Sequence, residues 1–125
     1  MKTKITKPIV KGKRLSSVQA NISSYVVYYI SGSSPAIGLA QEAEIDCFGE
    51  TGNRAGALYF YPDTIKLPEN QNTVNGIYLN FRMSRFADVI TLLKDEKPLY
   101  LYFDPANKSG YLGTSNEPIG EQEGV

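Results

Sequence analysis

Histidine is absent from this 125-residue sequence, and cysteine occurs once, as Cys47. Without histidine the chain lacks the commonest general base and the base of a serine-type triad. A single cysteine excludes an intramolecular disulfide and a cysteine-built zinc cluster, so Cys47 is expected to be a small buried apolar residue. Phosphate-loop and dinucleotide fingerprints are missing too. We therefore expect a protein that is not an enzyme and that holds no metal or cofactor.

Long hydrophobic runs are also missing. No apolar stretch of the sequence approaches the roughly 20 residues that a membrane-spanning helix needs, and the lysine-bearing start has no apolar segment of signal-peptide length. We expect a small, soluble, cytoplasmic protein without membrane contact. Thirteen basic and thirteen acidic residues cancel, so the whole molecule should have no general attraction for polyanions.

Charge is nevertheless unevenly distributed along the chain. Residues 1–14 are basic and residues 113–125 are acidic. We predict a flexible basic N-terminal arm over 1–14, one domain over 15–112 and an extended acidic tail over 113–125. The arm is either a nucleic-acid-binding segment, a solubilising terminus, or a terminus that lies against the acidic tail.

The clearest pattern lies between residues 76 and 112. Segments 77–82 and 99–103 alternate apolar and polar residues, which predicts two half-buried strands. Between them we predict a helix over 84–96, with Ser84 as the N-cap and Pro98 just beyond its end. Its apolar stripe recurs at helical spacing, at Phe86, Val89, Ile90 and Leu93. The strands would belong to a sheet with the helix across one face, although their pairing is left open.

Further strands are predicted at 18–22, 25–30, 43–47 and 57–61, and a short return strand is predicted to start at Tyr111 after the turn-rich stretch 104–110. Segment 25–30 is apolar on both faces and is interpreted as a central strand. The glycine-rich stretch 49–56 has neither the lysine nor the following helix of a phosphate loop, so we interpret it as a hairpin loop.

Three carboxylates alternate with the inward residues of segment 43–47. Glu42, Glu44 and Asp46 would share the outward face of that strand. Such a row can bind a divalent cation or perform acid–base chemistry. Because nothing nearby supplies further ligands, we interpret it as a solvated strand face.

These elements predict a single α+β domain. We expect a mainly antiparallel, strongly bent sheet or a partly open small barrel of about six or seven strands, with one helix packed across a face. The polar segment 64–75 is expected to be an exposed loop and a candidate contact surface.

Tyrosine is the positive functional signal, with nine in the chain. Several lie at strand positions opposite the apolar ones and, if the strands are neighbours, would form one row with an arginine beside it. The predicted binding residues are Tyr59, Tyr61, Tyr78, Arg82, Tyr100 and Tyr102. We expect this face, with loop 64–75, to engage another protein, since tyrosine and arginine are enriched at interface hot spots.

Three other interpretations stay open at this point. The tyrosines could stack unpaired bases while the basic arm contacts phosphates, as in a single-stranded nucleic-acid-binding protein. They could instead stabilise the sheet through cross-strand pairs alone, or be covered by other strands as core. An exposed sheet edge would also suit a homodimer.

Overall fold

A computed structural model describes residues 16–32 and 40–115 of the chain. The predicted arm over 1–14 and most of the predicted tail over 113–125 lie outside the described residues, and both stay predictions. The elements of the described part are β1 (Val18–Ile22), β2 (Ser24–Tyr29), β3 (Ala43–Phe48), β4 (Arg54–Tyr61), β5 (Gln71–Thr73), β6 (Gly76–Arg82), the 3-10 helix η3 (Met83–Arg85), α2 (Phe86–Asp95), β7 (Leu99–Asp104) and β8 (Ser109–Thr114).

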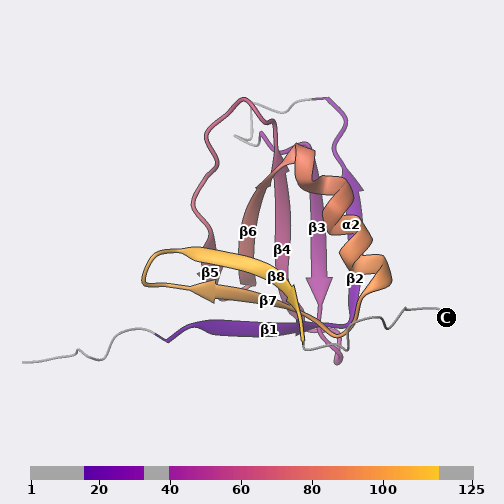
Figure 1. The fold of residues 1–125 in the computed structure, drawn as a ribbon, viewed down its shortest axis with the longest axis vertical. Coiled ribbons are helices and arrows are strands. Elements are labelled where there is room, and N and C mark those ends of the chain that lie inside the picture. Colours follow the sequence, from indigo (N-terminus) through magenta and orange to yellow (C-terminus); the bar gives the residue numbers. More distant parts are fainter. Residues whose placement is uncertain (1–15, 33–39, 116–125) are drawn as a thin grey trace, which may run out of the picture.

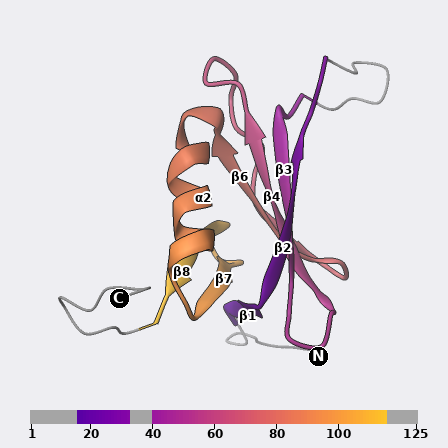
Figure 2. The same cartoon turned by 90° about the vertical axis from the view of Figure 1, so that its right-hand side faces the viewer.

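The described strands form two sheets. Five strands make one sheet in the order β2-β3-β4-β6-β5, and three make the other in the order β1-β7-β8. All neighbours are antiparallel except β4 and β6. The three-stranded sheet runs across one end of the larger sheet (Figure 1) and lies on the same side of it as α2 (Figure 2). The predicted α+β class is confirmed, with one helix on a sheet face and no closed barrel among the described strands, which are divided between two sheets.

The core lies between the large sheet, α2 and the small sheet. Its largest fully buried side chains include Ile45 of β3, Phe60 of β4, Leu79 of β6 and Leu101 of β7. These positions alternate with more exposed residues, as expected for strands with one buried face. The helix contributes its predicted stripe, with Phe86, Val89 and Leu93 buried, and Cys47 is buried as expected.

The start of the helix differs from the prediction. α2 begins at Phe86 after the 3-10 turn, and no side chain caps its first residues in the way predicted for Ser84. Instead, the Ser84 backbone N–H donates to Asp63 Oδ1 at 3.1 Å. Hydrogen bonds from Ser84 hold the pKa of the Asp63 carboxyl below its ordinary value. The acceptor for this turn is therefore Asp63, which follows β4 and is distant in the sequence, so local sequence cannot indicate it.

β2 is an edge strand, so the central position predicted for segment 25–30 is wrong. Among the described strands it pairs with β3 alone, and its apolar residues Val26, Val27, Tyr28 and Tyr29 are exposed. A strand that is apolar on both faces is typical of a buried centre. Here the apolar pattern instead marks a free edge.

The segment predicted as loop 64–75 is partly structured. Its end forms β5, which pairs antiparallel with β6, and Asn80 of β6 holds the preceding residues. The Asn80 side-chain amide donates to the carbonyl oxygens of Pro68 and Glu69 at 3.1 and 2.9 Å. The predicted hairpin near 49–56 is confirmed as the β3–β4 connection, although β4 begins at Arg54. No helix within the described residues is long and apolar enough to cross a membrane.

Candidate functional site

The six predicted binding residues do not form one row. Tyr59, Tyr61, Tyr78 and Arg82 come from β4 and β6 of the large sheet, whereas Tyr100 and Tyr102 come from β7 of the small sheet. Each alternates with residues that face the shared core. The small sheet lies on the α2 side of the large one (Figure 2). Since the residues that alternate with the tyrosines are buried between the two sheets, we infer that the two groups face away from each other.

A third tyrosine, Tyr111, contacts both Tyr100 and Tyr102 and was not among the predicted binding residues. Tyr111 of β8 lies opposite Tyr102 in the antiparallel register, and their rings stack with centroids 4.6 Å apart and 18° between planes. Tyr100 meets Tyr111 edge-on at 6.0 Å. On the third strand, Asn21 and Gln19 lie opposite Tyr100 and Tyr102. We call Tyr100, Tyr102, Tyr111, Gln19 and Asn21 the three-tyrosine surface.

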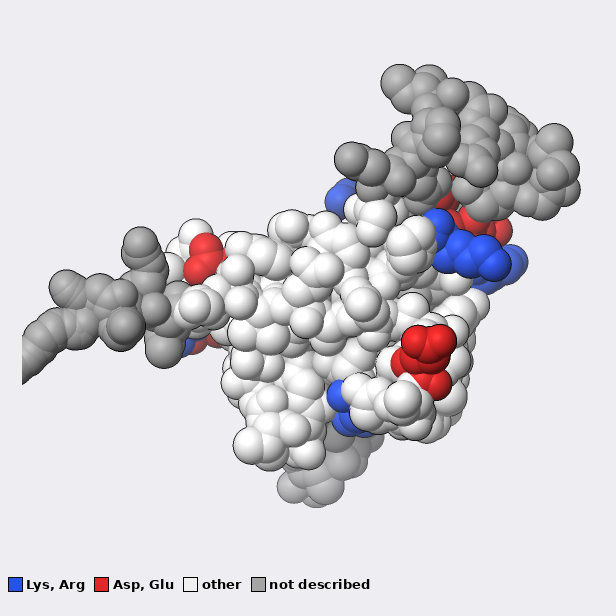
Figure 3. Space-filling model, turned by 90° about the horizontal axis from the view of Figure 1, so that it is seen from below, with Lys and Arg blue, Asp and Glu red and all other residues white. Residues whose placement is uncertain are grey.

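This surface is exposed and has little charge. Tyr111 keeps 46% of its surface exposed, and a hydrogen bond with Tyr100 raises the pKa of the Tyr111 hydroxyl. The side of the molecule on which the small sheet lies shows a broad area without charged side chains, with lysines, arginines and carboxylates toward its margins (Figure 3). Its chemistry is aromatic and amide-like.

Loop 64–75 adjoins the end of the small sheet. The Asn70 side-chain amide donates to the Lys108 carbonyl oxygen at 3.1 Å, and Glu69 Oε1 lies 3.8 Å from Lys108 Nζ. A hollow of about 570 Å³ separates the loop from the β7–β8 turn and includes Phe103 and Pro105 in its wall. The loop is thus adjacent to the turn that joins β7 and β8.

The opposite side carries a charged aromatic cluster. Tyr59 and Tyr78 meet edge-on at 5.6 Å, and the Arg54 guanidinium carbon lies 5.7 Å from the Tyr78 ring centre. Arg54 Nη1 lies 3.3 Å from Asp46 Oδ2. A register shift at Cys47/Phe48 accompanies the pairing of β3 with Arg54. Arg54 was not among the predicted site residues, because it lay in a predicted hairpin loop.

The predicted solvated row of carboxylates is wrong for one of its three members. Glu42 is exposed and Glu44 is half-buried, but Asp46 is buried, with 8% of its surface exposed. The Asp46 carboxylate is compensated by Arg54, as a buried charge requires. In residues 16–32 and 40–115 no group of three or more ligating side chains could hold a metal ion.

Burial and the neighbouring Asp46 change the protonation of this cluster. Burial, followed by the hydrogen bond and charge of Asp46, raises the pKa of Glu44 to about 7. Burial and the charge of Glu44 raise the pKa of Tyr59 to about 12. Glu44 therefore holds a proton up to near-neutral pH, which two adjacent carboxyls favour because they do not readily ionise together.

Because of Glu44, the free energy of unfolding should fall as the pH rises from about 4.5 to about 7. The folded protein keeps the Glu44 proton in this window while the unfolded chain loses it, so this contribution is complete below pH 4.5 and is lost as pH rises through 7. After allowance for solvent screening of a partly exposed carboxyl, we expect a loss of about 1–2 kcal/mol. Urea unfolding at intervals of pH should show this slope in the wild type and not in Glu44→Gln. An equal slope in both proteins would contradict the assignment.

Arg82 binds backbone carbonyl groups and is not part of a row of tyrosines. Its Nη1 donates to the carbonyl oxygens of Asp63 and Ile65 at 2.8 and 2.9 Å. Tyr61 lies opposite it in the β4–β6 register and is half-buried. Arg82 therefore holds the chain that leaves β4, and its loss would disturb that segment before any partner is considered.

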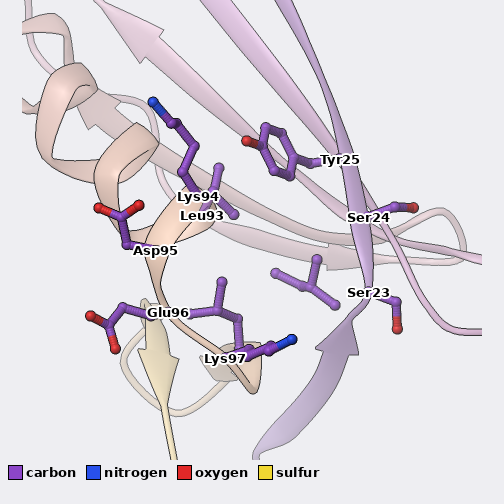
Figure 4. Close-up of a pocket in the computed structure, with 10 residues that line it drawn as sticks. Ser23, Ser24, Tyr25, Leu93, Lys94, Asp95, Glu96 and Lys97 are labelled. Carbon is purple, nitrogen blue, oxygen red and sulfur yellow. The ribbon is translucent and has the colours of Figure 1, made fainter. Parts of the chain in front are cut away.

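A second hollow, of about 610 Å³, lies between the end of α2 and the β1–β2 junction. Tyr25 and Leu93 line it, while the carboxylates of Asp95 and Glu96 point away from β2 (Figure 4). Small-molecule sites have a few polar groups that converge on the ligand. This hollow does not show that convergence.

Comparison of the chain with protein-family models, curated proteins and solved structures gives no significant match. A function is therefore proposed from the geometry of the three-tyrosine surface and of the aromatic cluster around Tyr59 and Tyr78.

Proposed function

We propose that the protein is a non-enzymatic binding or adaptor module that engages another protein through the three-tyrosine surface and the adjacent loop 64–75. The observation that carries the proposal is the stacked pair of Tyr102 and Tyr111, on a sheet face where the outward strand positions include one charged residue, Asp104. Tyrosine presents a large, rigid contact area with a polar end, which is why it is enriched at the centres of protein interfaces.

Sheet stabilisation alone is a weaker explanation for this surface. Cross-strand aromatic pairs contribute about 0.2–1 kcal/mol each whether or not a partner binds. However, Tyr111 leaves 46% of its surface in solvent, and a hollow whose wall includes Pro105 and Lys108 lies between the loop and the β7–β8 turn. A protein bound to the tyrosines and across this turn would cover both features.

The single-stranded nucleic-acid alternative has less support from charge. Stacking on tyrosines contributes about 1–3 kcal/mol per base, but affinity also depends on cations that neutralise phosphates. The strand register places only one charged residue, Asp104, among the outward positions of β1, β7 and β8, and it is negative. The basic arm on which this alternative relied lies outside the described residues.

Replacing Tyr102 and Tyr111 together with alanine should weaken capture of protein partners from the native host at least tenfold, about 1.4 kcal/mol. The matched control is the double variant Tyr59→Ala/Tyr78→Ala, which removes a tyrosine pair on the opposite side. Capture on immobilised protein, with the thermal midpoint measured in parallel, compares the variants.

Equal loss of capture in both double variants would place the contact elsewhere. The nucleic-acid alternative is tested by fluorescence anisotropy with a labelled mixed-sequence single strand at low and physiological salt. Saturable, salt-sensitive binding that Tyr100→Ala weakens would replace the protein-binding proposal.

A further inference from the structure

Within residues 16–32 and 40–115, the outer edge of β2 is not paired with another strand and lacks the features that usually protect the edge strands of monomers. Natural edges are blunted by lysine, proline or a bulge, yet residues 16–32 contain no charged residue and no proline. Val26, Tyr28 and Tyr29 are 43, 49 and 69% exposed. Figure 2 looks onto this edge, and no described element lies in front of β2.

The backbone of β2 is oriented to accept another strand. The Ile30 N–H donates to the Glu42 carbonyl oxygen at 3.0 Å, in register with the β2–β3 ladder. Backbone groups alternate sides along a strand, so even-numbered residues of β2 face β3. The N–H and C=O groups of Tyr25, Val27 and Tyr29 then face the open edge.

The side chains of β2 are complementary to a second copy of the same strand. In an antiparallel pair, directly opposite residues share a face, so a symmetric pair of copies is centred on a residue. Centring on Val27 places Val27 opposite itself and Tyr25 opposite Tyr29 of the second copy. On the other face Val26 meets Tyr28 of the second copy. In this register the backbone groups of Tyr25, Val27 and Tyr29, which face the open edge, all pair with the second copy and form about six hydrogen bonds.

We propose that β2 pairs antiparallel with β2 of a second copy of this chain, centred on Val27, and joins the two five-stranded sheets into one continuous sheet. The absence of charge over residues 16–32 means that no like charges oppose each other across the axis. This interface is separate from the three-tyrosine surface, so the inference does not depend on the proposed function.

The hollow at the end of α2 fits this arrangement. Tyr25 lines it together with Leu93, and the proposed register places Tyr29 of the second copy beside Tyr25. Tyr29 already contacts Phe86 of its own helix, with centroids 4.9 Å apart, yet remains 69% exposed. Pairing would cover this exposed ring and extend the apolar surface beside the hollow.

Sedimentation velocity over a range of concentrations should show a monomer–dimer equilibrium for the full chain. Val27→Lys places two ammonium groups opposite each other and should raise the dimer dissociation constant at least 100-fold. The matched control is Val74→Lys, because Val74 is fully exposed in the β5–β6 turn. A wild-type protein that stays monomeric at all concentrations, or equal weakening by both substitutions, overturns the proposal.

A cross-link tests the register and does not depend on the stability of the lysine variant. Opposite residues of a hydrogen-bonded antiparallel pair have Cα atoms about 5.5 Å apart, within disulfide range. Val27→Cys should therefore form a covalent dimer on oxidation, while Val26→Cys, which faces Tyr28 of the second copy, should not. Cys47 is buried and should not compete. Cross-linking of Val26→Cys alone, or of neither variant, overturns the register and the proposal with it.

Discussion

Replacing Gly56 with alanine is expected to lower the free energy of unfolding by about 3–5 kcal/mol, a loss in the range of severe core disruption. Gly56 lies in β4 beside β6 and has φ +159°. A Cβ atom there would overlap the Ile77 carbonyl oxygen and approach Ile77 N and Leu101 Cδ1 at 2.8 Å each. The backbone of β6 cannot withdraw without breaking the parallel pairing, and Leu101 belongs to the small sheet.

Gly52→Ala is the matched control, and urea unfolding is the measurement for both variants. Gly52 has φ +86° in the β3–β4 turn, but no atom lies within 4 Å of the position that a Cβ atom would occupy there. Alanine at this position should cost only the backbone strain of a left-handed conformation, about 1–2 kcal/mol. Equal losses at both positions would show that close packing of β4 against β6 is not what requires Gly56.

Much of the fold could be predicted from local patterns. Alternation identified the core-facing residues of β3, β4, β6 and β7, because one face of each strand packs on the core, although Asp46 of β3 and Ala57 of β4 are buried on the other face. The helical stripe from Phe86 to Leu93 was correct for the same reason. These signals are local: each depends on a period within one segment.

Strand pairing could not be predicted because it depends on contacts between distant segments. The strands on either side of α2 belong to different sheets, since β7 pairs with β1 and β8 while β6 pairs with β4 and β5. The alternating pattern predicts on which face of its own strand a tyrosine lies. It does not predict which sheet that strand joins. The predicted single row of tyrosines was therefore divided between two surfaces.

The candidate site was found in part. Tyr100 and Tyr102 were predicted, whereas the local pattern indicates Tyr111 only as the start of a return strand. The register of a hairpin around the 104–109 turn would have placed Tyr111 opposite Tyr102, so a signal for it was present in the sequence. Arg54 had no such signal, because its pairing with Asp46 depends on the register shift at the end of β3.

Phe60→Ala tests whether the large sheet and the helix unfold as one cooperative core. Phe60 is fully buried; its ring stacks on Phe81 of β6 at 5.5 Å and meets Phe86 of α2 edge-on at 5.0 Å. Removing a buried phenylalanine leaves a cavity and should cost about 3–5 kcal/mol. This loss should appear as one transition, because the same ring contacts the sheet and the helix.

The next residue provides the control for that substitution. Tyr61 is half-buried on the opposite face of β4, so Tyr61→Ala should cost about 1 kcal/mol or less. Urea unfolding followed by far-ultraviolet circular dichroism and by tyrosine fluorescence compares the two variants. Non-coincident transitions for Phe60→Ala would mean that α2 can separate from the large sheet. The helix would then be an independently unfolding element, and the β2 edge beside it would be more exposed than the native structure indicates.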